Sequence, residues 1–174
     1  KNKIIIGYVF ESSPKFGGNF QTEISTALRL KNLSLDKVEI KFFSTNKDNL
    51  QVLKKYGLEI KYYTKKNFNL NILKFYEFLT SKFTKKIFNL IFNFNGFEKF
   101  LLANSIDLVY FNSMSPTALV LKKIDFITSY WDMAHLEYPL FPESKENYHS
   151  ISAREYIYKN LADNSLYVLT DSKE

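Results

Sequence analysis

Residues 3–19, KIIIGYVFESSPKFGGN, decide the fold, because an apolar run passes through a glycine-bearing loop into a helical pattern. The run that opens this stretch, residues 3–10, is short and apolar, which is typical of a buried strand. Residues 20–30 then place Ile24, Ala27 and Leu28 at helical spacing. A strand, a loop with glycines and a helix in this order predict the start of a βαβ unit.

The rest of the chain repeats this alternation. Apolar runs predict five further strands at residues 38–44, 58–63, 106–112, 126–131 and 165–170. Helical patterns follow at residues 48–56, 116–122 and 148–161. Strands separated by helix-length segments indicate right-handed crossovers and a parallel sheet covered on both faces. The sequence therefore predicts one α/β domain over residues 1–174, a Rossmann-like three-layer α/β/α arrangement with a mainly parallel sheet.

Composition and charge exclude some classes of site and favour some classes of partner. The chain has no cysteine, which excludes a disulfide framework, a thiol nucleophile and a zinc-thiolate site. Residues 1–64 hold 11 basic and 6 acidic side chains, residues 65–104 hold 7 and 2, and residues 105–174 hold 6 and 10. A basic first part favours a face for anions such as phosphates or acidic lipid head groups, although compositional bias of the source is an alternative. With only two arginines, nucleic acid is not an expected partner.

The two ends of the chain bear on its location and completeness. No run of 18 apolar residues and no signal-peptide layout occur, so we expect a cytoplasmic protein, with peripheral contact at the inner face of the membrane as an option. Residues 171–174, DSKE, follow a predicted strand and have the pattern of a capping box. They predict a further helix, and hence the N-terminal domain of a longer enzyme; a frayed natural terminus is the alternative.

The first candidate site is the loop with Gly17, Gly18 and Asn19. In open α/β sheets, ligands bind beyond the carboxyl ends of the strands, where helix N-termini present free N–H groups. The two glycines would let a ligand approach the backbone, and Asn19 is placed to cap the helix. The spacing matches neither the dinucleotide fingerprint nor the phosphate loop. A simple turn is the alternative.

The second candidate site is the stretch WDMAHLEYPLFPE at residues 131–143. Asp132 and His135 are three positions apart, so the carboxylate could hold the imidazole by one nitrogen and leave the other for a proton or a phosphate oxygen. Alternatively, Asp132 caps the next segment while Trp131 and His135 pack against the sheet. No metal is expected, because His149 is the only other histidine.

This stretch resembles the N-terminal half of family 4 GT-B glycosyltransferases. It is similar to the WDxxHxxxPxFPE motif of one subgroup, where relatives have HDxxHxxxP. The pattern Arg154-Glu155-x-x-Tyr158 and the Asp171-Ser172 pair after the last strand belong to the same resemblance, as does the glycine loop. The resemblance covers residues 4–20 and 105–174.

The resemblance implies a retaining, metal-independent transfer of a sugar from a nucleotide sugar, without a cofactor, between two Rossmann domains. The N-terminal domain mostly binds the acceptor, here a glycan or lipid-linked molecule of cell-surface glycan or glycolipid synthesis. The nucleotide-binding domain would follow this chain, which alone would be inactive. By resemblance, Asp132 and His135 are catalytic, with Trp131 where relatives carry a histidine. The residues expected to bind substrate are Gly17, Gly18, Asn19, Trp131, Glu143 and Arg154.

Two further observations leave alternatives open. Residues 72–94 carry an apolar stripe at spacings of three and four with lysines beside it, which is typical of a helix that seeks acidic membranes or of one packed on the sheet. In addition, half of a GT-B-like nucleotide-sugar epimerase and a non-catalytic module for carbohydrate, nucleotide or protein are alternative functions. Catalytic carboxylates and a second histidine near the cleft would favour the epimerase.

Overall fold

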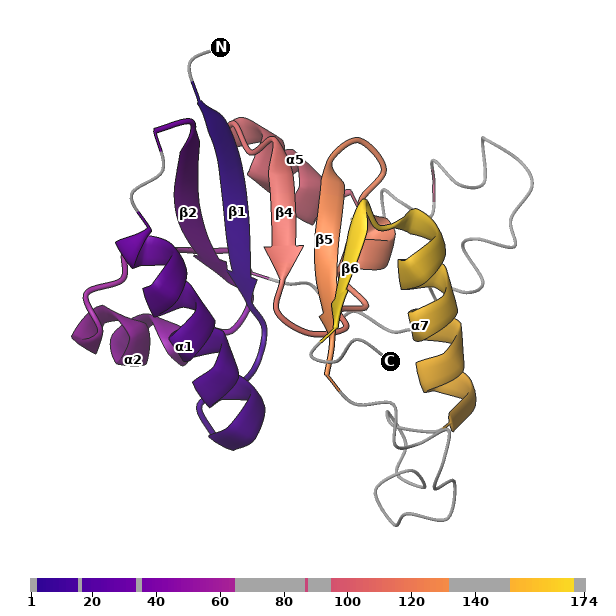
Figure 1. Cartoon of the computed structure of the whole chain (residues 1–174), viewed down its shortest axis with the longest axis horizontal. Helices are drawn as coiled ribbons and strands as arrows, with labels where there is room; N and C mark the ends of the chain where they lie inside the picture. The colour runs from indigo at the N-terminus through magenta and orange to yellow at the C-terminus, as the bar shows by residue number, and fades with distance from the viewer. Residues whose placement is uncertain are drawn as a thin grey trace.

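The centre of the protein is a six-stranded sheet (Figure 1). The structure is a computed structural model that describes residues 3–15, 17–33, 36–64, 87, 95–131 and 151–170, without the side chains of residues 151–153. Its strands are β1 (Ile4–Phe10), β2 (Val38–Ser44), β3 (Ile60–Tyr62), β4 (Leu108–Phe111), β5 (Asp125–Tyr130) and β6 (Tyr167–Thr170). They lie in the order β3-β2-β1-β4-β5-β6, and all five pairings are parallel. The Rossmann-like prediction is confirmed.

The strand order reverses between β1 and β4. From β1 the chain moves outward to β3, and it then returns to place β4 on the other side of β1. Connections on the two sides of this point leave the sheet in opposite directions, which opens a crevice at the carboxyl ends of the strands. In open α/β sheets, ligands bind at such a point, so a ligand is expected near the carboxyl ends of β1 and β4.

Helices cover the two faces of the sheet. One face carries α1 (Gly17–Asn32) and α2 (Asn49–Lys55), and the other carries α5 (Gly96–Ala103), the 3-10 helix η1 (Ala118–Val120) and α7 (Ile151–Asn164). Tyr8 and Phe10 of β1 pack beneath α1, whereas Val9 between them packs on the opposite side. This alternation is what the pleat of a strand imposes on a sheet buried between helices.

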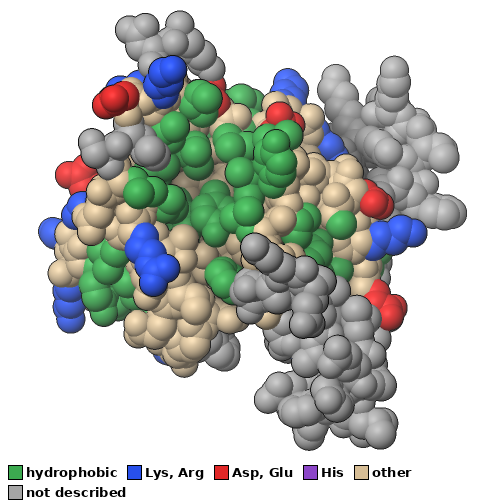
Figure 2. All heavy atoms as spheres, in the orientation of Figure 1, with side chains coloured by type: hydrophobic (Ala, Val, Ile, Leu, Met, Phe, Trp, Pro, Cys, Tyr) green, Lys and Arg blue, Asp and Glu red, His purple; other side chains and the backbone are tan. Residues whose placement is uncertain are grey.

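The cover on the α1 face is incomplete among the described residues. In Figure 1, no described helix lies in front of β4, β5 and β6 on this face. Tyr167 is 64% exposed and Leu169 is 45% exposed. Figure 2, in the same orientation, shows hydrophobic side chains gathered over this part of the sheet. The predicted cover on both faces therefore holds for the β1–β2–β3 half, within the described residues.

The helix predicted at residues 116–122 is wrong. Only the three residues of η1 are helical, and Leu121 after them is extended. The cause is Glu98 of α5, which is 3% exposed and whose Oε1 accepts the N–H groups of Lys122, Lys123 and Ile124 at 2.5, 2.5 and 3.3 Å. Amides bound to this carboxylate are not available to continue a helix.

Two other predictions concern segments that are partly outside the described residues. The last predicted helix corresponds to α7, while residues 148–150 lie outside. The apolar stripe at residues 72–94 also lies outside, except for Ile87, which is 44% exposed. Within the described segments, no helix combines the length and the hydropathy needed to cross a bilayer.

Candidate functional site

The described candidate residues lie at one edge of the sheet, where the strands end. Gly17, Gly18 and Asn19 form the first turn of α1, Trp131 directly follows β5, and Arg154 is in the first turn of α7. These three segments all meet the carboxyl edge in Figure 1. The other candidates, Asp132, His135 and Glu143, lie outside the described residues.

The predicted cap at Asn19 is wrong. Because α1 already begins at Gly17, Asn19 is its third residue, and its carbonyl accepts the Thr22 hydroxyl at 2.8 Å. A Cβ atom added at Gly17 or Gly18 would meet no described atom within 4 Å. The first turn of α1 is therefore open with respect to the described residues, and its N–H groups have no partner within the helix. The prediction that a ligand approaches here stays a prediction.

A buried glutamate that the sequence reasoning missed anchors the connection before α1. Glu23 is 2% exposed, and its Oε1 accepts the N–H groups of Glu11 and Ser12 at 3.3 and 3.2 Å and the Ser12 hydroxyl at 3.0 Å. Burial raises the pKa of the Glu23 carboxyl to about 7, against the opposing effect of these hydrogen bonds. A signal was present, since Glu23 lies on the same helix face as Phe20 and Ala27.

A second buried side chain ties the connections after β1 and β2 together. Asn49, the first residue of α2, is fully buried and its Nδ2 donates to the Ser12 carbonyl at 3.0 Å and to the Ser44 hydroxyl at 3.1 Å. Its Oδ1 has no partner among the described residues. Because the bonds of Asn49 and Glu23 meet at Ser12, the β1–α1 connection is held from both sides.

Asn112 ties together the connections on the other side of the switch point, which is the place between β1 and β4 where the strand order reverses. It follows β4, is 2% exposed, and its carbonyl accepts the indole N–H of Trp131. Its Nδ2 donates weakly to the Thr22 hydroxyl of α1 at 3.4 Å, and its Oδ1 has no partner in the described part of the chain. Asn112 therefore links the start of α1 to Trp131, whose side chain stays 45% exposed.

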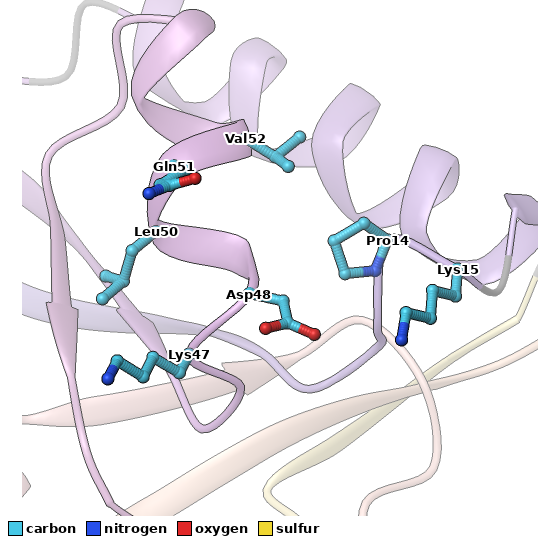
Figure 3. Close-up of a pocket in the computed structure, with 7 residues that line it drawn as sticks. All are labelled: Pro14, Lys15, Lys47, Asp48, Leu50, Gln51 and Val52. Carbon is cyan, nitrogen blue, oxygen red and sulfur yellow. The ribbon is translucent and has the colours of Figure 1, made fainter.

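An open pocket of about 630 Å³ lies beside these connections (Figure 3). Pro14 and Lys15 of the β1–α1 connection line one side. In Figure 3, the Asp48 carboxylate lies between Pro14 and Lys47. The lining on the α2 side is formed by Lys47, Asp48, Leu50, Gln51 and Val52. Among the described residues, which include neither histidine, no three His, Asp or Glu side chains are grouped as metal ligands would be.

Comparison with known proteins bears on the fold. No protein-family model and no curated protein matches the sequence. The chain is similar to a putative UDP-N-acetylglucosamine 2-epimerase from Listeria monocytogenes, with a TM-score of 0.57 and 12% identity over 99% of this chain and 40% of that one. A glycosyltransferase from Rickettsia africae ESF-5 gives a TM-score of 0.46 and 16% identity over 98% of this chain and 43% of that one. The chain thus spans less than half the length of either structure, and the likeness to the epimerase agrees with a GT-B-like, Rossmann-type fold.

Proposed function

We propose that the chain is the acceptor-side domain of a two-domain glycosyltransferase, which transfers a sugar from a nucleotide sugar to a glycan or lipid-linked acceptor. The observation that carries this proposal is the convergence of three features at the switch point. They are the first turn of α1 at Gly17 and Gly18, which no described residue covers, the buried side chain of Asn112, and the indole of Trp131, which donates to the main-chain carbonyl of Asn112. The motif at residues 131–143 supports the same function by resemblance.

The chemistry of such a transfer suits these groups. When the nucleoside diphosphate departs, negative charge develops on its phosphate, and free N–H groups at a helix N-terminus can donate to it. The half-exposed Trp131 offers an apolar surface for a sugar ring, with its N–H already satisfied by Asn112. Asp132 and His135 follow Trp131 in the chain and would orient sugar hydroxyls; a retaining, metal-independent mechanism is part of the proposal.

A second candidate is half of a GT-B-like nucleotide-sugar epimerase. The similar structure with a TM-score of 0.57 is named a putative UDP-N-acetylglucosamine 2-epimerase, and the 40% of its chain that matches has a fold like the one described here. The two candidates differ in their products, because transfer needs an acceptor and releases a nucleoside diphosphate, whereas epimerisation inverts one centre of the sugar and needs no acceptor.

Product analysis of the protein expressed from its complete reading frame tests the proposal. We expect UDP- or GDP-sugars to release nucleoside diphosphate only when an acceptor is present. Gly17→Val places a branched side chain at the first turn of α1, where no described atom lies within 4 Å of the added Cβ, and should lower the transfer rate about tenfold or more without unfolding the protein.

The matched control is Ser25→Val, which introduces the same side chain on an exposed position of the same helix. Its activity should equal that of the parent. Equal activity in both variants would remove the role assigned to the start of α1. Conversion of the donor without any acceptor would select the epimerase.

A further inference from the structure

The pocket between the β1–α1 connection and α2 is distinct from the features that carry the proposed function. Its volume of about 630 Å³ is within the range of small-molecule sites. It lies at the same carboxyl edge as the start of α1, because Lys15 precedes Gly17 by two positions. We call it the lysine pocket, after Lys15 and Lys47 in its lining (Figure 3).

The walls of the lysine pocket are held in place without a ligand. Asn49 ties the connection after β1 to the end of β2 through Ser12 and Ser44, and Glu23 binds Ser12 from the other side. All of these hydrogen bonds come from side chains that are at most 2% exposed. A pocket whose walls are already ordered loses little conformational entropy when it binds a ligand.

The lining combines three chemistries. The ammonium groups of Lys15 and Lys47 are exposed and form no ion pair within the described residues, and they come from separate connections. Lysine is suited to bind a phosphate or carboxylate as a point charge. Asp48 can accept hydrogen bonds from hydroxyl groups, and Gln51 can accept or donate them. Pro14, Leu50 and Val52 add the apolar surface that the C–H face of a sugar ring would contact.

We propose that the lysine pocket binds a sugar unit that carries an anionic group, a carboxylate or a phosphate. Two lysines against one aspartate leave a net positive charge for the anion, and Asp48 with Gln51 serves the hydroxyls. The identification of this sugar as part of the acceptor rests on the proposed function. The proposal that the pocket binds an anionic sugar does not depend on the proposed function.

Titration of the ¹⁵N-labelled chain, followed by NMR, tests the pocket with three probes: glucuronate, glucose 6-phosphate and glucose. We expect the backbone amide signals of Lys15, Lys47 and Asp48 to shift with both charged sugars. Lys47→Gln should weaken the charged sugars about fivefold and leave glucose unchanged, since an exposed charge contributes modestly. The control Lys55→Gln removes the same charge from α2, outside the pocket lining, and should bind like the parent.

Asp48→Asn separates recognition of hydroxyls from general attraction of anions. If Asp48 binds hydroxyl groups, this variant should bind glucose more weakly. If the pocket only attracts anions, the variant should bind the charged sugars more tightly and leave glucose binding unchanged. The proposal is overturned if Lys47→Gln and Lys55→Gln weaken binding equally, or if glucose binds as tightly as the charged sugars. The preferred charged sugar identifies the anion as carboxylate or phosphate. In the protein expressed from its complete reading frame, sugar binding without transfer activity would refute the proposed function alone, and transfer activity with an unoccupied pocket would refute the pocket alone.

Discussion

The two halves of the sheet differ in how their α1-side faces are covered. Tyr8, Tyr110, Ile127 and Tyr167 are neighbours in one row across β1, β4, β5 and β6. Tyr8 lies beneath α1 and is fully buried, whereas Tyr167 at the other end of the row is 64% exposed. Right-handed connections place helices on one face while the chain moves toward β3 and on the other while it moves toward β6. Cover in this fold is therefore set by the direction of the connections, and apolar strand residues can remain open where no connection passes.

Truncation of one apolar strand residue in each half of the α1-side face gives the largest expected difference in stability. Phe10 of β1 is fully buried on the α1-side face and packs edge-on against Tyr8 at 5.0 Å, so Phe10→Ala should lower the free energy of unfolding by about 3–5 kcal/mol. Leu169→Ala on β6 should change it by about 0.5 kcal/mol or less. Urea unfolding measures both. A loss of more than about 2 kcal/mol in Leu169→Ala would mean that a segment outside the described residues covers this face.

The pH dependence of the free energy of unfolding tests the buried carboxyl of Glu23, which anchors the β1–α1 connection. Burial raises the pKa of Glu23 from its ordinary value of 4.5 to about 7, so the folded protein holds this proton more tightly than the unfolded chain. The stabilisation is complete below pH 4.5 and is lost as the pH rises through 7, by about 3 kcal/mol in total. Urea unfolding of the parent at pH 4.5, 6, 7 and 8 should follow this decline.

Glu23→Gln keeps the shape of the side chain and removes its titration. The decline in stability between pH 4.5 and pH 8 should therefore flatten in this variant. Glu59→Gln, at an exposed position, should leave the parent slope unchanged. Equal slopes in the parent and in Glu23→Gln would show that another group produces the decline.

Two glycines give the smallest expected effects, with opposite signs. A Cβ atom at Gly7 of β1 would lie 3.1 Å from Cγ2 of Ile106 and 3.2 Å from Cε2 of Phe43, so Gly7→Ala should destabilise by about 1–2 kcal/mol. Gly17→Ala should stabilise by up to about 1 kcal/mol, because the new methyl group meets no described atom within 4 Å and the unfolded chain becomes stiffer. Thermal midpoints compare the two. A destabilised Gly17→Ala would place residues outside the described segments against this turn.

The strands could be predicted from the sequence because each is a local apolar run bounded by polar or turn-forming residues. All six lie within two residues of the predicted bounds. Helix boundaries were harder to predict from the sequence. The helical stripe of Ile24, Ala27 and Leu28 indicated α1, but its start at Gly17 instead of Phe20 depends on how the connection is anchored to Glu23. Propensity at Gly17 and Gly18 is weak enough for tertiary contacts to decide.

The location of the candidate site could be predicted from the sequence better than the identity of the buried polar residues that support it. Gly17, Gly18 and Trp131 do lie at the carboxyl edge, because topology follows from the order of strands and helices. Asn49 and Asn112 could not be identified, since an asparagine at the end of a polar loop and one that is buried look alike until helices are packed on the sheet. Glu23 was also missed but could have been identified, because a charge on an apolar helix face is itself unusual.

The contact of Glu98 with three consecutive amides has a consequence for how this chain can diverge. In these contacts, the Glu98 carboxylate accepts hydrogen bonds from main-chain N–H groups, and the side chains of Lys122 and Lys123 are exposed. Any residue except proline can supply such an N–H group. The course of this turn is therefore set by one side chain 24 positions upstream of Lys122, and substitutions at the exposed Lys122 and Lys123 are tolerated, whereas the buried Ile124 is also held by its own packing.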